Sequence, residues 1–422
     1  MFLYFKFSNY KSFKNEILFS MIAGNSSEFP ENTFQEKNFQ LLKSSVIYGA
    51  NASGKSNFFD AVTFFIDFIK NSQLMGVEEY IECPKFLLST ESQDSPVNFE
   101  ISFILENNIY RYGFSIENGI ISKEWLYINY TRKETLLFKR NYQKFTIGSK
   151  FQLEKNIEKK TKENTLFLSV LGQWNNETAI EIIKWIKKIH VLKGNSVFSP
   201  MYTSNQIKSN RFKGKILTML KDVDINFEGV KIEEKNINID EISNEMTKII
   251  LDKLKNNNNN SDIKTMDVIV QHSKYDENNN FKGIVDFDLK KQESEGTKKF
   301  YSLAGPILDT IEKNGILFID ELENSLHPLI LEYILKLFNN ENLNKKAQII
   351  FSTHNTNILD TKKLRRDQIW FTEKNRYGES VLYSLLEIKG EREGQSFERK
   401  YLKGNYGGIP IVSDEIGECY EE

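Results

Sequence analysis

Residues 49–56 read GANASGKS, which places Gly49, Gly54, Lys55 and Ser56 at the fixed positions of the pattern GxxxxGK[ST]. The two glycines let the backbone fold into a nest whose N–H groups point inward at phosphate oxygens, and a following helix adds the positive end of its dipole. Lys55 is expected to reach the β- and γ-phosphates, and the Ser56 hydroxyl to ligate Mg²⁺. The stretch therefore predicts a site for a nucleoside triphosphate. The alternative is a glycine-rich turn without a ligand.

The flanking residues fit the strand, loop and helix order that this pattern requires. Residues 45–48 (SVIY) are typical of a short buried strand, and residues 57–70 (NFFDAVTFFIDFIK) of a mostly apolar helix. Asn51, Ser53 and Asn57 lie within the loop or directly after it, so we expect them among the nucleotide-binding residues.

The bulk composition is that of an ordinary globular protein. With 422 residues, of which 40% are hydrophobic, the chain can bury one large core or two smaller ones, and its length favours two to three domains. The 56 basic and 58 acidic residues give a net charge of −2, so any contact with DNA would need a local basic patch. Two groups of basic residues could contact DNA phosphates, and the alternative is that they form an ordinary solvated surface. These residues are Lys184, Lys187, Lys188, Lys208, Arg211, Lys213, Lys215 and Lys221.

Cysteine usage and hydropathy favour a cytoplasmic location. Cys83 and Cys419 have no CxxC or CxxH spacing, which supports neither a disulfide framework nor a zinc site. The apolar residues 1–7 are interrupted by Lys6 and lack the features of a signal peptide. No stretch approaches the ~18 apolar residues needed to cross a bilayer, so we expect no membrane partner.

Residues 1–150 are expected to form the first half of an α/β domain. Alternating side chains in residues 3–13 are typical of an edge strand, and several β-type runs follow between residues 97 and 138. An antiparallel sheet is therefore predicted after the first helix. Its hairpin turns are expected at Asn107-Asn108 and Asn118-Gly119.

The second and third regions complete a predicted α/β fold. Residues 151–262 change to a helical pattern and are expected to form a helical insertion, with amphipathic helices at 178–190 and 239–255. Residues 263–422 are expected to form the second half of the domain, because they contain short continuous apolar runs typical of parallel strands covered on both faces. These runs are residues 315–319 and 348–352.

Residues 316–321 (ILFIDE) supply a second acidic element. An apolar strand that ends in two carboxylates places Asp320 to hold the water shell of Mg²⁺ and Glu321 to polarise an attacking water. Such a strand is weak evidence alone. Together with the phosphate loop it predicts ATP hydrolysis.

Three further segments resemble the motifs of ABC-class ATPases. Residues 294–297 (SEGT) resemble the short signature motif of the SMC branch, residues 322–328 (LENSLHP) the D-loop, and residues 352–355 (STHN) the H-loop with its histidine, His354. The order of phosphate loop, signature, acidic strand (the Walker B motif, residues 316–321), D-loop and H-loop is that of the class. The alternatives are a core histidine for His354 and an ordinary helix cap for residues 294–297.

The signature resemblance implies a dimer. The Ser294 hydroxyl and the Gly296 N–H at a helix N-terminus make an anion site, which in this class faces the γ-phosphate held by the opposite subunit. Two chains would then sandwich two ATP molecules, and a higher oligomer stays open. His327 is expected to pack at the dimer face rather than to catalyse.

The chain resembles the ATPase heads of the SMC, RecF and OLD group, in particular the AAA-type ATP-binding proteins of bacterial phage-defence and abortive-infection operons. The segments FKFSNYKSFKNE, KKQESEGTKKF, ILFIDELENSLHP and YLKGNYGGIP carry this resemblance. It implies an ATPase head with a parallel-sheet core and an antiparallel β subdomain. Gln73 is the candidate for the Q-loop glutamine.

The function implied is an ATP-hydrolysing dimeric switch of anti-phage defence that controls a separately encoded effector, such as a nuclease or toxin. The residues after Trp370 are too few for a TOPRIM nuclease domain, and no histidine follows an arginine at the spacing of a HEPN ribonuclease. The effector is therefore expected in another chain. The alternatives are a RecF-like DNA-repair ATPase acting on duplex DNA, and a scaffold that binds ATP for assembly with negligible turnover.

Overall fold

The computed structural model describes residues 1–129, 133–193, 199–236, 264–360, 363–390 and 396–409. They belong to two compact units. The first comprises Met1–Ser196, Thr310–Asn324 and Leu331–Glu422, and the second comprises Val197–Asp309 and Ser325–Ile330. Among the residues described, no helix is both long and apolar enough to span a membrane.

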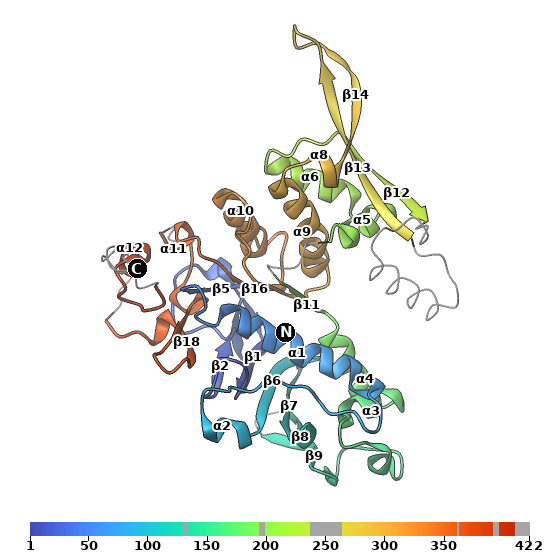
Figure 1. The fold of residues 1–422 in the computed structure, drawn as a ribbon, viewed down its shortest axis with the longest axis vertical. Helices are drawn as coiled ribbons and strands as arrows, with labels where there is room; N and C mark the ends of the chain where they lie inside the picture. The colour runs from blue at the N-terminus through green and yellow to red at the C-terminus, as the bar shows by residue number, and fades with distance from the viewer. Residues whose placement is uncertain (130–132, 194–198, 237–263, 361–362, 391–395, 410–422) are drawn as a thin grey trace, which may run out of the picture. The chain divides into compact units, whose positions relative to one another are not determined.

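The first unit contains a six-stranded sheet in the order β11-β15-β16-β5-β17-β18 (Figure 1). Its neighbours pair in parallel from β11 to β17, and β18 joins β17 antiparallel. Every residue of β5, β15 and β16 is buried, as expected for strands covered on both faces. The two parallel strands expected in the last region are therefore confirmed. The strands are β11 (Ile189–Leu192), β15 (Ile316–Ile319), β16 (Gln348–Ser352), β5 (Ser44–Gly49), β17 (Ile369–Lys374) and β18 (Ser380–Ser384).

The second sheet of this unit is antiparallel and seven-stranded, in the order β10-β9-β8-β7-β6-β1-β2. It confirms the antiparallel sheet expected after the first helix. The turn at Asn118-Gly119 has the positive φ angles of a tight hairpin, whereas the earlier turn is made by Glu106-Asn107, one residue before the expected position. The strands are β1 (Phe2–Ser8), β2 (Ile17–Ser20), β6 (Val97–Leu105), β7 (Asn108–Glu117), β8 (Ile120–Asn129), β9 (Glu134–Asn141) and β10 (Lys144–Ile147).

The helix α1 (Lys55–Asn71) is held by aromatic contacts to both sheets. Its Phe65 ring centroid lies 5.4 Å from that of Phe114 in the antiparallel sheet. Its Phe59 lies 6.3 Å from Phe318 in β15 of the other sheet. Because the start of α1 follows the phosphate loop directly, this shared core fixes the loop at the carboxyl end of β5.

Smaller elements complete the first unit. Residues 178–190 were expected to be one helix, but α4 ends at Ile186 and Ile189 begins β11. Residues 189–192 form a strand and not the end of the helix because they pair with β15, which is distant in the sequence. The elements are β3 (Thr33–Glu36), β4 (Phe39–Leu42), α2 (Thr90–Asp94), α3 (Phe167–Gln173), α4 (Glu177–Ile186), α11 (Asn357–Asp360) and α12 (Phe397–Leu402).

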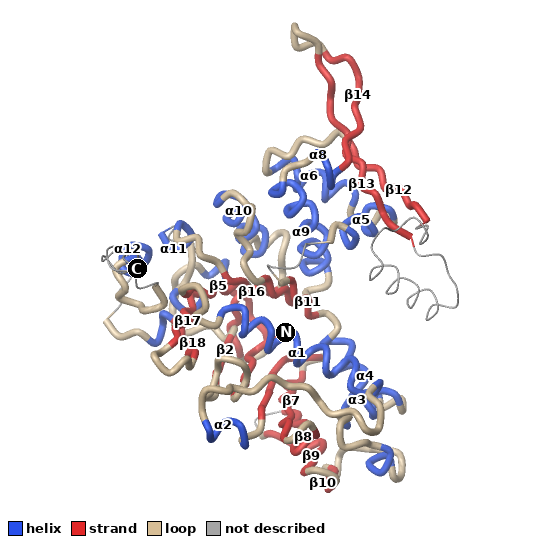
Figure 2. The backbone as a smooth tube through the Cα atoms, in the orientation of Figure 1, coloured by secondary structure: helices blue, strands red, loops and turns tan. Residues whose placement is uncertain are grey.

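The second unit combines helices with a three-stranded antiparallel sheet in the order β12-β13-β14. Figure 2 shows β13 and β14 as a long ribbon that extends beyond the helices of its own unit. The helix expected at residues 239–255 lies outside the described residues. The elements are α5 (Met201–Lys208), α6 (Lys213–Asp222), β12 (Gly229–Asn236), β13 (Lys264–Tyr275), β14 (Phe281–Asp288), α8 (Leu289–Gln292) and most of α9 (Glu295–Glu312); α10 (Pro328–Asn339) begins here and continues in the first unit.

The unit boundaries differ from the domain boundaries expected at residues 150 and 262. Residues 151–196 belong to the first unit, whose sheet includes β11 as an edge strand. Residues 263–309 belong to the second unit, because β13 and β14 continue the sheet that β12 begins. The helical sequence pattern therefore does not mark where the second unit starts.

Candidate functional site

The phosphate loop connects the end of β5 to the start of α1, and its two glycines stand where the chain has no room for a side chain. A Cβ on Gly49 would lie 2.5 Å from the Thr372 carbonyl oxygen in β17. A Cβ on Gly54 would lie 2.5 Å from the Ser380 Oγ of β18, and Gly54 has a left-handed φ of 122°. Close approach of the neighbouring strands therefore requires glycine at both positions.

Lys55 is buried and folded back on its own loop. Its Nζ donates to the carbonyl oxygens of Gly49 at 2.7 Å and of Ala50 at 3.1 Å. Burial lowers the pKa of Lys55, and the nearby carboxylates of Asp320 and Glu321 act in the opposite direction. An ammonium that rests on two neutral carbonyls can transfer these bonds to an anionic ligand, which is the stronger acceptor.

Side chains from other strands brace the loop. Ser53 Oγ lies 2.6 Å from Thr372 Oγ1, and Ser380 Oγ donates to the Ser53 carbonyl at 2.6 Å. Asn57 Nδ2 donates to Ser12 Oγ at 2.7 Å. No local motif indicates Thr372 and Ser380, because strand pairing brings them to the loop. The expected ligand-binding residues Asn51 and Ser56 are exposed.

One serine contacts both acidic residues after β15. Ser352 Oγ donates to Asp320 Oδ1 at 2.6 Å and accepts the Glu321 backbone N–H at 2.7 Å. Glu321 has a left-handed φ of 52°, which is costly for a residue with a side chain. Its Oε2 accepts a hydrogen bond from Asn324 Nδ2 at 2.6 Å, so the carboxylate is held in one orientation.

His354 lies at the end of β16 in an environment that disfavours its charged form. Burial and the neighbouring Lys55 lower the pKa of His354. Its backbone N–H donates to Glu323 Oε1, and the Tyr48 hydroxyl donates to the carbonyl of the next residue, Asn355, at 3.0 Å. Glu323 Oε2 is buried and has no hydrogen-bond partner within the described chain. The structure thus brings the phosphate loop, the acidic pair and the histidine to the carboxyl ends of neighbouring parallel strands.

The signature-like segment lies in the second unit, at the start of α9. Ser294 Oγ accepts the Thr297 backbone N–H at 3.1 Å, which is the hydrogen bond of a helix cap. A Cβ on Gly296 would lie 2.7 Å from the Ser325 carbonyl oxygen, so the D-loop segment requires glycine there. The segment therefore forms the helix cap that was the alternative interpretation. Its role as an anion site remains a prediction.

Residues 44–360 match the family described as "AAA domain, putative AbiEii toxin, Type IV TA system". The chain belongs to this AAA family. Among solved structures, it is similar to the SMC head domain from Thermotoga maritima, with 13% identity, coverage of 91% of this chain and 98% of that chain, and a TM-score of 0.38. It is also similar to an SMC head bound to the C-winged helix domain of ScpA, with 12% identity, coverage of 95% and 99%, and a TM-score of 0.41. No curated protein matches the chain.

The oxygen donors of this AAA-family site fit Mg²⁺ that is bound together with a nucleotide. The described residues contain no group of three or more His, Cys, Asp or Glu side chains that could hold a metal by themselves. Ser56 and Asp320 offer a hydroxyl and a carboxylate, and Mg²⁺ commonly takes one or two such ligands beside water and phosphate oxygens.

Gln73 does not lie at the phosphate loop. It follows the C-terminal end of α1, whereas the loop precedes the first residue of this 17-residue helix. At about 1.5 Å per residue, the helix separates the two by roughly 25 Å. The Q-loop glutamine of this AAA-family chain therefore remains unplaced.

Ion pairs neutralise several of the basic residues considered for DNA contact. Lys208 pairs with Glu234, and Arg211 Nη1 lies 3.1 Å from Asp309 Oδ1. Lys184 lies 2.8 Å from Glu181. The remaining candidates are exposed, as expected for a solvated surface, and comprise Lys187, Lys188, Lys213, Lys215 and Lys221.

Proposed function

We propose that this chain binds ATP together with Mg²⁺ and hydrolyses it. The observation that supports this proposal best is the arrangement of three adjacent strands, β15, β16 and β5. They end in the acidic pair, the His354 segment and the phosphate loop. Membership of the AAA family over residues 44–360 agrees with this reading.

Each residue has a distinct part in the proposed reaction. Lys55 would leave the two loop carbonyls to bind the β- and γ-phosphates, and Ser56 and Asp320 would hold Mg²⁺, which would supply the charge that stabilises the phosphate oxygens. Glu321, oriented by Asn324, accepts a proton from the attacking water. His354, kept neutral by its surroundings, is available to hydrogen-bond near the γ-phosphate.

Phosphate release and nucleotide binding test the proposal in two variants. Lys55→Ala should lose ATP binding, whereas Glu321→Gln should keep binding and lose turnover by at least about a hundredfold. Glu341→Gln removes the same charge from an exposed position and should behave like the parent. A parent protein that binds no ATP would refute the function, and one that binds ATP without phosphate release would be the assembly scaffold.

We further infer that two chains close around ATP, with Ser294 and Gly296 of one chain facing the γ-phosphate held by the other. A higher oligomer built from such dimers stays open. The exposure of Ser294 at the start of α9 supports this inference, because the first N–H groups of a helix favour an anion. The association would then depend on a charge that hydrolysis removes.

The cellular role that we propose is control of a separately encoded effector in anti-phage defence. The family description, which names a toxin and a toxin–antitoxin system, supports a role of this kind. Expression of this chain alone, the neighbouring gene alone and both together, scored by growth, tests it. We expect the neighbour to be toxic and this chain to change that toxicity. Growth arrest by this chain alone would make it the toxin itself.

A further inference from the structure

A glycine-rich turn near the C-terminal end of the described chain contacts the start of the phosphate loop. It follows α12, and Gly407 and Gly408 both have a left-handed φ of 66°. A Cβ on Gly408 would lie 3.0 Å from the Thr372 carbonyl oxygen and 3.4 Å from the Gly49 Cα. The turn therefore packs directly on the residue at which β5 becomes the phosphate loop.

Tyr401 fixes this turn and packs against the residue that precedes Gly49. Its hydroxyl donates to the Gly408 carbonyl at 3.1 Å, and its ring stacks on Phe371 with centroids 5.4 Å apart. The same ring lies 5.7 Å from Tyr48, which precedes Gly49. Burial raises the pKa of Tyr401 to about 12, while a hydrogen bond with the Gly49 backbone acts in the opposite direction. The phenol is therefore neutral and able to donate at physiological pH.

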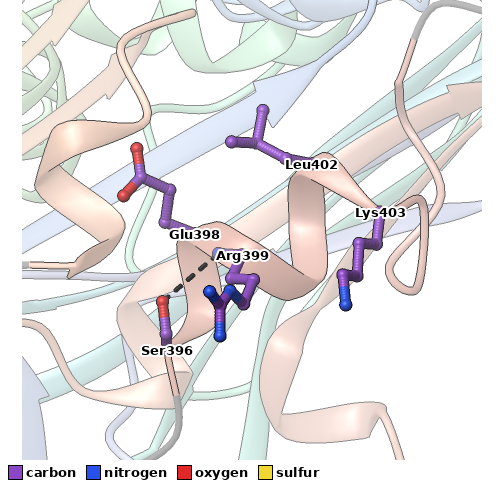
Figure 3. Close-up of a pocket in the computed structure, with 5 residues that line it drawn as sticks. All are labelled: Ser396, Glu398, Arg399, Leu402 and Lys403. Atoms are coloured by element: carbon purple, nitrogen blue, oxygen red, sulfur yellow. Dashed lines mark hydrogen bonds between the residues drawn. The ribbon is translucent and has the colours of Figure 1, made fainter.

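The helix α12 also contacts the segment after His354. Glu398 Oε1 accepts a hydrogen bond from Thr356 Oγ1 at 2.6 Å. Figure 3 shows the hollow that this helix lines with other side chains, among them Arg399 and the largely exposed Leu402. The segment thus joins two parts of the candidate site from one side.

We propose that Tyr401 and the Gly407-Gly408 turn form a positioning element for the phosphate loop, which holds the Gly49 backbone in the conformation that receives the nucleotide phosphates. The inference rests on the proposed ATP binding. The element acts through its neighbours: Gly408 packs on the Thr372 carbonyl, and Thr372 Oγ1 in turn lies 2.6 Å from Ser53 Oγ within the loop. It should therefore set nucleotide affinity and leave the hydrolysis step unchanged.

The variant Tyr401→Phe removes the hydroxyl and keeps the stacked ring. Loss of the hydrogen bond to the Gly408 carbonyl should raise the Kd for MgATP about five- to tenfold, raise KM by the same factor and leave kcat within about twofold of the parent value. The matched control is Tyr4→Phe, whose hydroxyl donates to Glu100 Oε1 at 3.1 Å in the antiparallel sheet, away from the turn. It should keep the parent Kd.

A second pair of variants tests the turn without touching an aromatic ring. Gly408→Ala and Gly404→Ala both place a side chain on left-handed backbone, but at Gly404 the new Cβ meets only the flexible end of Ile409, at 3.0 Å. Both variants should lose thermal stability, and only Gly408→Ala should weaken MgATP binding, by about tenfold.

The parent is measured first. If it binds no MgATP, the proposed function fails and the positioning element is refuted with it. If the parent binds and both Tyr401→Phe and Gly408→Ala keep its Kd, the positioning element alone is refuted. Equal weakening by Tyr4→Phe or Gly404→Ala, or a fall in kcat at unchanged KM, would also overturn it, because the effect would then be general packing or chemistry.

Discussion

At the scale of the single residue, Ser352 holds the Asp320 side chain and the Glu321 backbone. It is fully buried, and its hydroxyl bonds Asp320 Oδ1 and the Glu321 backbone. Ser352→Ala should lower the unfolding free energy by about 1–3 kcal/mol, since it leaves buried polar groups unpaired. The Mg²⁺ concentration needed for half-maximal turnover should also rise, because Asp320 loses its fixed orientation. Denaturant unfolding and a Mg²⁺ titration measure the two effects.

Ser45→Ala is the matched control for this change. Ser45 is equally buried in β5, and its hydroxyl donates to the Gln368 carbonyl at 3.0 Å. It should lower stability and leave the Mg²⁺ dependence unchanged. Indistinguishable Mg²⁺ titrations for Ser352→Ala and the parent would show that Ser352 has only a structural part.

The protonation of His354 gives a prediction on pH. Its pKa in the folded chain lies below the ordinary 6.5, so the unfolded chain takes up the proton first as pH falls. The unfolding free energy should therefore decrease as pH drops below about 6.5, and this part of the loss should be smaller in His354→Gln. Denaturant unfolding at pH 7.5 and 5.5 measures it. His327, which is exposed like His354 but belongs to the second unit, is changed to Gln as the control, and identical losses in parent and His354→Gln would contradict the assignment.

At the scale of the element, a buried carboxylate joins the antiparallel sheet to α3. Glu124 of β8 accepts the backbone N–H groups of Phe167 and Leu168 at 2.7 and 2.9 Å, and lies 3.6 Å from the fully buried Arg140. Glu124→Ala leaves this guanidinium without its carboxylate and should cost about 3–5 kcal/mol of stability in denaturant unfolding.

An exposed ion pair in the same sheet is the control for that loss. Glu134 bonds Arg111 at 2.8 Å with a side chain that is 47% exposed, so Glu134→Ala should cost less than about 1 kcal/mol. Equal losses for the two variants would show that burial does not decide the contribution of these pairs.

The sequence predicts those elements whose signal is local. The strands β5, β15 and β16 are continuous apolar runs next to their motifs, and the Asn118-Gly119 turn carries its own backbone preference. By contrast, the local pattern of β11 predicts the end of a helix, because its partner β15 is distant in the sequence. The sequence also does not predict the site residues Thr372, Ser380 and Tyr401, because tertiary contacts alone place them beside the loop.

At the scale of the whole molecule, the motif residues are divided between two compact units. The phosphate loop, the acidic pair and His354 belong to the first unit, whereas Ser294 and Gly296 belong to the second. The sequence motifs indicate both parts but not this division, which depends on long-range strand pairing. In the proposed dimer, the second unit of one chain would supply its helix start to the nucleotide of the other.

The molecular mass of Glu321→Gln in solution, with and without MgATP, is the sharpest test of the ATP-dependent dimer. Because the variant should bind ATP and not hydrolyse it, we expect a monomer without nucleotide and a stable dimer with it. Adding Ser294→Arg should return the MgATP-bound protein to a monomer. A Glu321→Gln protein that binds MgATP and keeps the same mass as without it would rule out this dimer.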